Sequence, residues 1–147
     1  AVKALVEFGD VRAVEPLIAA LKDEDKMVRK GVVEALVDFA DIRAIGPLIV
    51  ALKDEDKWVL IAIVEALVKF GDRLAVKPLI AVLENNNKTE HESESATIAV
   101  VKALVKFRDR RAVGPLKNIL IHSHPYGSLR KAIVKALVEF GDERSDE

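Results

Sequence analysis

Hydrophobic and polar positions alternate along this chain with the period of an α-helix, in pairs of segments joined by short polar connections. A first segment runs from Arg12 to Lys22 and carries apolar residues at Val14, Leu17, Ile18 and Leu21. A second runs from Lys26 to Phe39, with apolar residues at Val28, Val32, Ala35, Leu36 and Phe39. Apolar residues three and four positions apart share one face of a helix, so both segments are predicted to be amphipathic helices. Because the connection is short, the two helices are predicted to be antiparallel.

The two-helix pattern recurs through the whole sequence. The second helix ends on VKALVEFGD at 2–10, VEALVDFAD at 33–41, VEALVKFGD at 64–72, VKALVKFRD at 101–109 and VKALVEFGD at 134–142. Four of these are followed by RAVEPLI at 12–18, RAIGPLI at 43–49, LAVKPLI at 74–80 and RAVGPLK at 111–117. Two motifs that recur together, the second always at the same distance after the first, indicate a repeat protein. We expect one domain over 1–147, divided into a partial repeat 1–10, repeats 11–41, 42–72, 73–109 and 110–142, and a tail 143–147.

The ends of the helices carry their own signals. Asp25 precedes the second helix as a predicted N-cap. Glycines at 9, 71 and 141 follow the helix-ending phenylalanines, where a left-handed residue is expected. Ala40 and Arg108 occupy the same position, so positive φ is predicted for both. The Asp and Arg that recur after these helices, as in Asp41 and Arg43, are interpreted as a cap plus a ladder contact between neighbouring turns.

The phased motif resembles the short HEAT-like repeats of phycobilisome-lyase-type proteins over the entire chain. The resemblance implies an all-α solenoid, a superhelix in which stacked helix pairs share a core and the second helices line the concave face. Such repeats occur in lyase subunits, hydroxylases and plain adaptors. We expect a non-enzymatic scaffold that binds a protein partner without a cofactor; the alternative is a bilin-lyase-like subunit or chaperone that holds a tetrapyrrole.

A partner-binding strip is predicted on the outward positions of the second helices. The outer repeats carry Lys30 and Lys131 where the middle two carry Ile61 and Ile98. An aromatic anchor with aliphatic neighbours and a charged rim is typical of protein-binding surfaces. The predicted strip consists of Met27, Trp58, Ile61, Ala62, Glu65, Lys69, Ile98, Ala99, Lys102 and Lys106. The alternative is that these apolar residues are buried by a loop or by rotation of a helix.

The connections of the third and fourth repeats depart from the pattern and contain every histidine of the chain. They read LENNNKTEHESES at 83–95 and ILIHSHPYGS at 119–128. A metal such as Zn²⁺ could be bound by His122 and His124 together with His91, Glu92 or Glu94 across the gap. Their spacing is no recognised metal signature and loop histidines are commonly only solvated, so no metal site is expected. The His-Glu iron ligands of the HEAT-repeat enzyme deoxyhypusine hydroxylase have no counterpart here, because the aligned pairs are Lys30-Gly31, Ile61-Ala62, Ile98-Ala99 and Lys131-Ala132.

Composition narrows the function classes further. A net charge of −1 does not favour nucleic acid, and no apolar run approaches the roughly 20 residues of a membrane span. Cysteine is absent, which excludes disulfides and thiolate metal sites in this chain. We expect a cytoplasmic protein. The chain starts within a second helix and ends on GDERSDE, the start of a further motif. It is therefore expected to be a fragment of a longer array or to lack its first residues, and it could self-associate through its uncapped N-terminal end.

Overall fold

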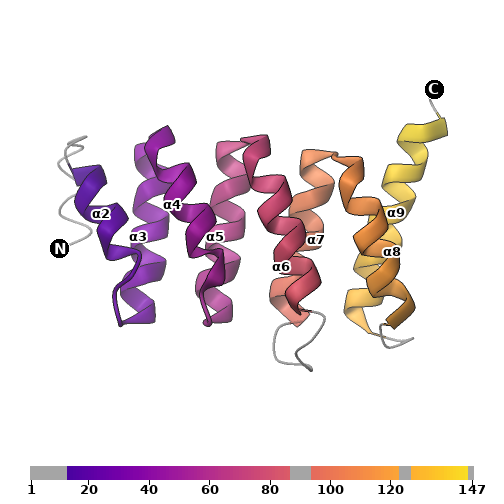
Figure 1. Cartoon of the computed structure of the whole chain (residues 1–147), viewed down its shortest axis with the longest axis horizontal. Helices are drawn as coiled ribbons and strands as arrows, with labels where there is room; N and C mark the ends of the chain where they lie inside the picture. The colour runs from indigo at the N-terminus through magenta and orange to yellow at the C-terminus, as the bar shows by residue number, and fades with distance from the viewer. Residues whose placement is uncertain (1–12, 87–93, 123–126, 146–147) are drawn as a thin grey trace. The chain divides into compact units, whose positions relative to one another are not determined.

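The computed structural model describes residues 13–86, 94–122 and 127–145, and every regular element in these ranges is helical (Figure 1). The predicted second helix at 26–39 is found with those bounds, as α3 (Lys26–Phe39). The opening segment 1–12, which includes the end at which self-association is expected, lies outside the described residues. The chain groups into two compact units, Ala1–Ala75 and Val76–Glu147, each described below by itself.

The first unit contains two stacked helix pairs. Its elements are α2 (Val14–Ala20), α3, the short 3₁₀ helix η2 (Ile42–Ala44), α4 (Ile45–Val50), η3 (Ala51–Lys53), α5 (Lys57–Phe70) and η4 (Arg73–Ala75). Helix α2 packs on α3 and α4 packs on α5, while the two second helices, α3 and α5, pack on each other. This is the all-α architecture of a solenoid, in which each pair covers the apolar face of its neighbour.

The second unit repeats this arrangement. It consists of α6 (Val76–Asn86), α7 (Glu94–Phe107), η5 (Arg110–Ala112), α8 (Val113–His122) and α9 (Ser128–Ser145). Helix α6 packs on α7, α8 packs on α9, and the second helices α7 and α9 pack on each other. The sequence repeat is therefore a structural repeat in both units.

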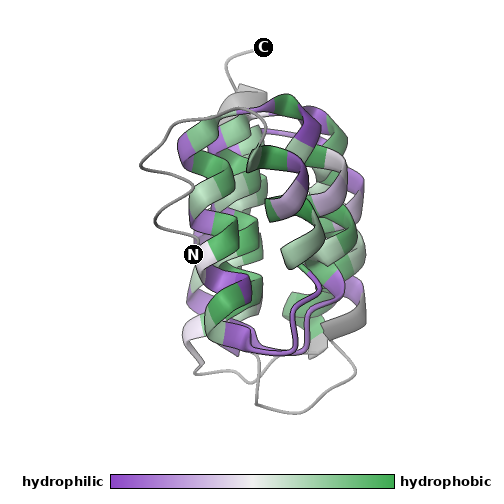
Figure 2. Cartoon of the chain, turned by 90° about the vertical axis from the view of Figure 1, so that its left-hand side faces the viewer, coloured by the Kyte–Doolittle hydropathy of each residue, from purple (hydrophilic) through white to green (hydrophobic). Residues whose placement is uncertain are grey.

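The core follows the predicted apolar stripes, with one addition. Figure 2 shows hydrophobic residues concentrated along the helices and hydrophilic residues in the connections. In α3, Val32, Ala35 and Leu36 are buried as predicted. Val33 is also buried, with 1% of its surface exposed, although it lies outside the stripe that faces α2. Because α3 packs on α5 as well as on α2, each second helix needs a second apolar row for the neighbouring repeat.

The caps predicted at Asp25, Ala40 and Arg108 are found in the structure. The Asp25 carboxylate accepts a hydrogen bond of 2.8 Å from the Met27 N–H at the start of α3. At the C-terminal ends, Ala40 has φ 52° and Arg108 has φ 54°, next to φ 68° at Gly71. The expectation of positive φ at both non-glycine positions is confirmed. Both residues carry a Cβ atom, which makes the left-handed conformation unfavourable for them.

Replacing Ala40 or Arg108 by glycine should therefore stabilise the protein. Ala40→Gly and Arg108→Gly are each expected to raise the free energy of unfolding by about 0.5–1 kcal/mol, because glycine adopts the left-handed conformation without strain. Thermal or urea unfolding measures the change. Gly71→Ala is the matched control and should destabilise by a similar amount. Lower melting temperatures for both glycine variants would contradict the assignment of strain.

One expectation about the repeat ends needs correction. Gly141 does not end its helix with positive φ, because α9 continues through it to Ser145. Glycine permits either conformation, so its presence at this position does not by itself require a turn. The cap expected of the recurrent Asp is confirmed, because Asp41 Oδ1 accepts a hydrogen bond of 2.9 Å from the Arg43 N–H, and Arg43 Nη2 lies 2.7 Å from Oδ2 of the same carboxylate. A contact between repeats exists as well, from Arg43 Nη1 to Glu15 Oε1 at 3.6 Å.

The outer face of α9 differs from the same face of the other second helices. Val33 in α3 and Val101 in α7 are each 1% exposed, because α5 and α9 respectively pack on those helices. The equivalent Val134 in α9 is 42% exposed. The residue at this position of the repeat is thus buried in α3 and α7, where the second helix of the next repeat packs on it, and exposed in α9.

None of the described helices is long and apolar enough to span a bilayer.

Candidate protein-binding groove

The second helices α3 and α5 of the first unit border a groove with a volume of about 500 Å³. Each of them is the second helix of its repeat, the two repeats are consecutive, and the two helices pack side by side. Small and branched apolar residues line the groove between charged ones. The lining residues are Lys30, Val33, Glu34, Val37 and Asp38 from α3, and Trp58, Ala62, Glu65, Ala66 and Lys69 from α5.

The repeat register orders the lining residues along the groove. Residues 31 positions apart in sequence are equivalent, so Glu34 and Glu65 lie at the same level, as do Asp38 and Lys69. Trp58 lies seven residues before Glu65 on α5, which corresponds to about 10 Å along a helix. The groove therefore has an aromatic end, an acidic middle and an end of mixed charge.

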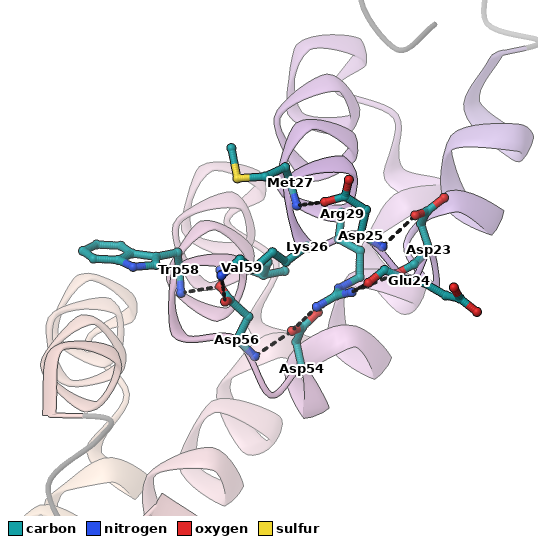
Figure 3. A network of polar contacts seen from close by, with 10 residues as sticks. All are labelled: Asp23, Glu24, Asp25, Lys26, Met27, Arg29, Asp54, Asp56, Trp58 and Val59. Carbon is teal, nitrogen blue, oxygen red and sulfur yellow. Dashed lines mark hydrogen bonds and ion pairs between the residues drawn. The ribbon is translucent and has the colours of Figure 1, made fainter.

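Two large apolar side chains are exposed at the aromatic end. Met27 is 67% exposed and Trp58 is 56% exposed, and they occupy equivalent positions near the starts of α3 and α5. Figure 3 shows that both side chains point away from the polar network behind them. The Lys57 Nζ lies 5.3 Å from the centroid of the Trp58 ring, a cation–π distance. An exposed aromatic residue beside an exposed methionine is typical of protein-binding surfaces.

A polar network fixes the ends of the helices that carry these two residues (Figure 3). Arg29 of α3 donates to both carboxylate oxygens of Asp54, over 2.8 and 3.2 Å, and so joins α3 to the connection that precedes α5. It also donates to the backbone oxygens of Asp23 and Glu24. The hydrogen bond with Asp54 raises the pKa of Arg29. This bidentate ion pair fixes the relative position of the two helix starts.

Asp56 connects the network to Trp58. Its carboxylate accepts hydrogen bonds from the backbone N–H groups of Trp58 and Val59, at 2.9 and 3.0 Å, and caps α5. The bond from Val59, followed by that from Trp58, lowers the pKa of Asp56, so the cap is ionised at neutral pH. Lys26 of α3 also lies 3.7 Å from this carboxylate. The backbone that carries the exposed indole is thus held from both repeats.

The charged residues of the groove have no such partners. Within the described part of the chain, Lys30, Glu34, Asp38, Glu65 and Lys69 form no ion pair or side-chain hydrogen bond. Three carboxylates and two ammonium groups therefore remain available to a ligand.

The groove contains part of the strip predicted from sequence. Trp58, Ala62, Glu65 and Lys69 line it, and Met27 lies at an equivalent position at its aromatic end. Ile61 is half-buried and does not line it. The rest of the strip lies on α7 of the second unit, where Ile98 and Ala99 are half-buried and Lys102 and Lys106 are exposed. That part of the strip stays a prediction.

Apart from Met27, sequence reasoning left the residues of α3 out of the strip. Lys30, Glu34 and Asp38 follow each other at a spacing of four residues, which places them in one row on the helix surface. That spacing could have identified them as one wall. The strip was assigned to the middle two repeats because they carry Ile61 and Ile98. These two residues gave no information on which helices border a groove.

The histidine site cannot be placed by the structure. His91 and His124 lie outside the described residues, and for His122, at the end of α8, only the backbone is described. Among the described side chains no group of three or more histidine, aspartate or glutamate residues could hold a metal ion.

Comparison with known proteins agrees with the repeat architecture. A family model described as HEAT repeats matches residues 1–48, and the motifs in this range recur through the rest of the sequence. The fold of the chain is that of stacked HEAT-like helix pairs. No curated protein matches its sequence. Among solved structures, the HEAT-like chain is similar to a chain in the complex of CpcE and CpcF of phycocyanin lyase from Nostoc sp. PCC7120.

That structural likeness extends over nearly the whole of this chain. The TM-score is 0.70 at 23% sequence identity, and the match covers 98% of this chain. It covers 59% of the other chain, so the HEAT-like chain spans about three-fifths of the length of that lyase chain. The fold agrees with the resemblance to lyase-type HEAT-like repeats in the sequence motifs.

Proposed function

We propose that this HEAT-like chain is a non-enzymatic scaffold that binds a segment of a partner protein along the α3/α5 groove. The observation that carries the proposal is the exposure of Trp58 beside Met27 at one end of a groove whose charged residues are unpaired in the described part of the chain. Burying an exposed indole and a thioether on binding releases water from apolar surface, and tryptophan is enriched among residues that dominate binding energy.

The structural neighbour supports a protein partner. It is a chain in a complex of CpcE with CpcF, so a protein of this fold assembles with another protein there. The Arg29–Asp54 network adds a physical reason for binding at this point. It holds the starts of α3 and α5 together, and a preorganised surface loses less conformational entropy on binding than a mobile one.

Trp58 provides the direct test because it is the chain's single tryptophan. Helical peptides of about 15 residues, displayed as a library, can be selected for binding to the whole chain. Selected peptides are expected to shift the emission of Trp58 to shorter wavelength in a saturable way, because the indole leaves water. Peptides that saturate the protein with unchanged Trp58 emission would place binding elsewhere and contradict the proposal.

Binding of a bilin, as in a lyase subunit, is the second candidate function. The similarity to a phycocyanin lyase chain favours it, and Lys30 and Lys69 in the groove could pair with propionate groups of a tetrapyrrole beside Trp58. This proposal predicts that an added bilin changes its visible absorption and quenches Trp58 at equimolar concentration. A bilin whose spectrum is unchanged by the protein would contradict it.

A further inference from the structure

The shape of the α3/α5 groove favours a helical occupant. The groove runs between two second helices that pack side by side, and its lining includes Ala62 and Ala66 on α5. Small side chains let the backbone of another helix approach closely, and a helix laid between two others is a recurrent way of recognising a peptide. A helix would also bring its apolar face to the half-buried Val37 on the α3 side.

The charges of the groove indicate what this helix carries. Glu34 and Glu65 occupy equivalent levels on the two walls, so like charges lie across the middle of the groove. Neither has an ion pair in the described part of the chain. A Lys or Arg side chain placed between them would form charge-assisted hydrogen bonds, whereas an acidic side chain would be repelled.

The spacing along the groove sets the pattern in the partner. From Trp58 to Glu65, and from Met27 to Glu34, the separation is seven residues, about 10 Å of helix. A helix running along the groove needs the same rise between its apolar anchor and its basic residue. Positions seven apart, two turns, also lie on the same face of that helix.

We infer that the α3/α5 groove takes an amphipathic helix with an apolar anchor on Trp58 and Met27 and a Lys or Arg seven positions away, between Glu34 and Glu65. This inference rests on the proposed function and specifies its partner. It assigns the two glutamates the role of selecting a basic residue, and Trp58 the role of the anchor.

The library selection described above tests the inference through the sequences it returns. Selected peptides are expected to be enriched in Lys or Arg seven positions before or after an aromatic or aliphatic anchor. The binding of one such peptide to the double variant Glu34→Gln/Glu65→Gln should weaken about tenfold and lose most of its salt dependence. Circular dichroism should show the variant folded, since both glutamates are exposed.

A matched control separates this local effect from that of net charge. Glu55→Gln/Glu84→Gln removes the same two charges at exposed positions outside the groove, and peptide affinity should stay within about twofold. A peptide with Glu in place of the basic residue should bind better to Glu34→Lys/Glu65→Lys than to the unaltered chain, which a purely structural role for the glutamates would not produce.

The failures of the two proposals are distinguishable. Peptides that change Trp58 emission but show no basic preference, or that are equally sensitive to both double glutamine variants, overturn the basic-helix inference and leave the groove as a binding site. Selected peptides that all bind without affecting Trp58 overturn the proposed function and the inference together.

Discussion

Val101→Lys is expected to lower the free energy of unfolding by about 3 kcal/mol or more, because it would place an unpaired ammonium group in the core. Val101 lies on α7 with 1% of its surface exposed, at the face on which α9 packs. The change removes the apolar contact between two repeats and buries a charge where no described carboxylate pairs with it. Urea unfolding followed by far-UV circular dichroism measures the loss.

The control for this variant is the same substitution at the equivalent position of the last repeat. Val134 lies on α9 and is 42% exposed, so Val134→Lys should change the free energy of unfolding by no more than about 0.5 kcal/mol. The pair of variants compares one residue type at one repeat position, with and without a stacked neighbour. Equal losses from both would show that stacking on α9 is not what buries Val101.

Trp58→Ala is expected to weaken the binding of a groove-selected helix by about 2 kcal/mol or more, roughly 30-fold in Kd. The indole is 56% exposed in the free chain, so its removal costs little folding energy, and most of its effect should fall on binding. Isothermal titration calorimetry measures the affinity, since the variant has no tryptophan left as a fluorescent reporter.

Leu74→Ala serves as the control for the tryptophan variant. Leu74 is 72% exposed on η4 and lines no part of the α3/α5 groove, so its truncation removes exposed apolar surface elsewhere. Affinity is expected to change less than twofold, or about 0.4 kcal/mol. Comparable losses from the two variants would mean that the peptide binds by general hydrophobic adhesion.

The fold could be predicted from sequence because its signals are local and repeated. The helical period, the Asp25 cap and the glycine positions each report on a few neighbouring residues, and five copies of one motif average out exceptions. Positive φ at Ala40 and Arg108 was predicted from their alignment with Gly9, Gly71 and Gly141. The same reasoning failed at Gly141, where glycine permits a turn without requiring one.

The site was less predictable because it depends on which helices pack together. Trp58 was identified from its outward position, but the opposite wall, with Lys30 and Glu34, comes from another repeat, and the pattern within one repeat does not show which helices border a groove. The bond from Arg29 to Asp54 is another case, since it joins residues 25 positions apart through side chains. Neither feature follows from helical periodicity, which specifies the buried face and leaves the arrangement of polar neighbours open.

Hydrogen exchange of the chain with and without a saturating groove-selected peptide tests the central claim most directly. Binding along the α3/α5 groove predicts slower exchange in Lys26–Phe39 and Lys57–Phe70 and unchanged exchange in Ser128–Ser145. Slower exchange confined to α7 or α9, with none in α3 and α5, would contradict the account and place the binding surface in the second unit.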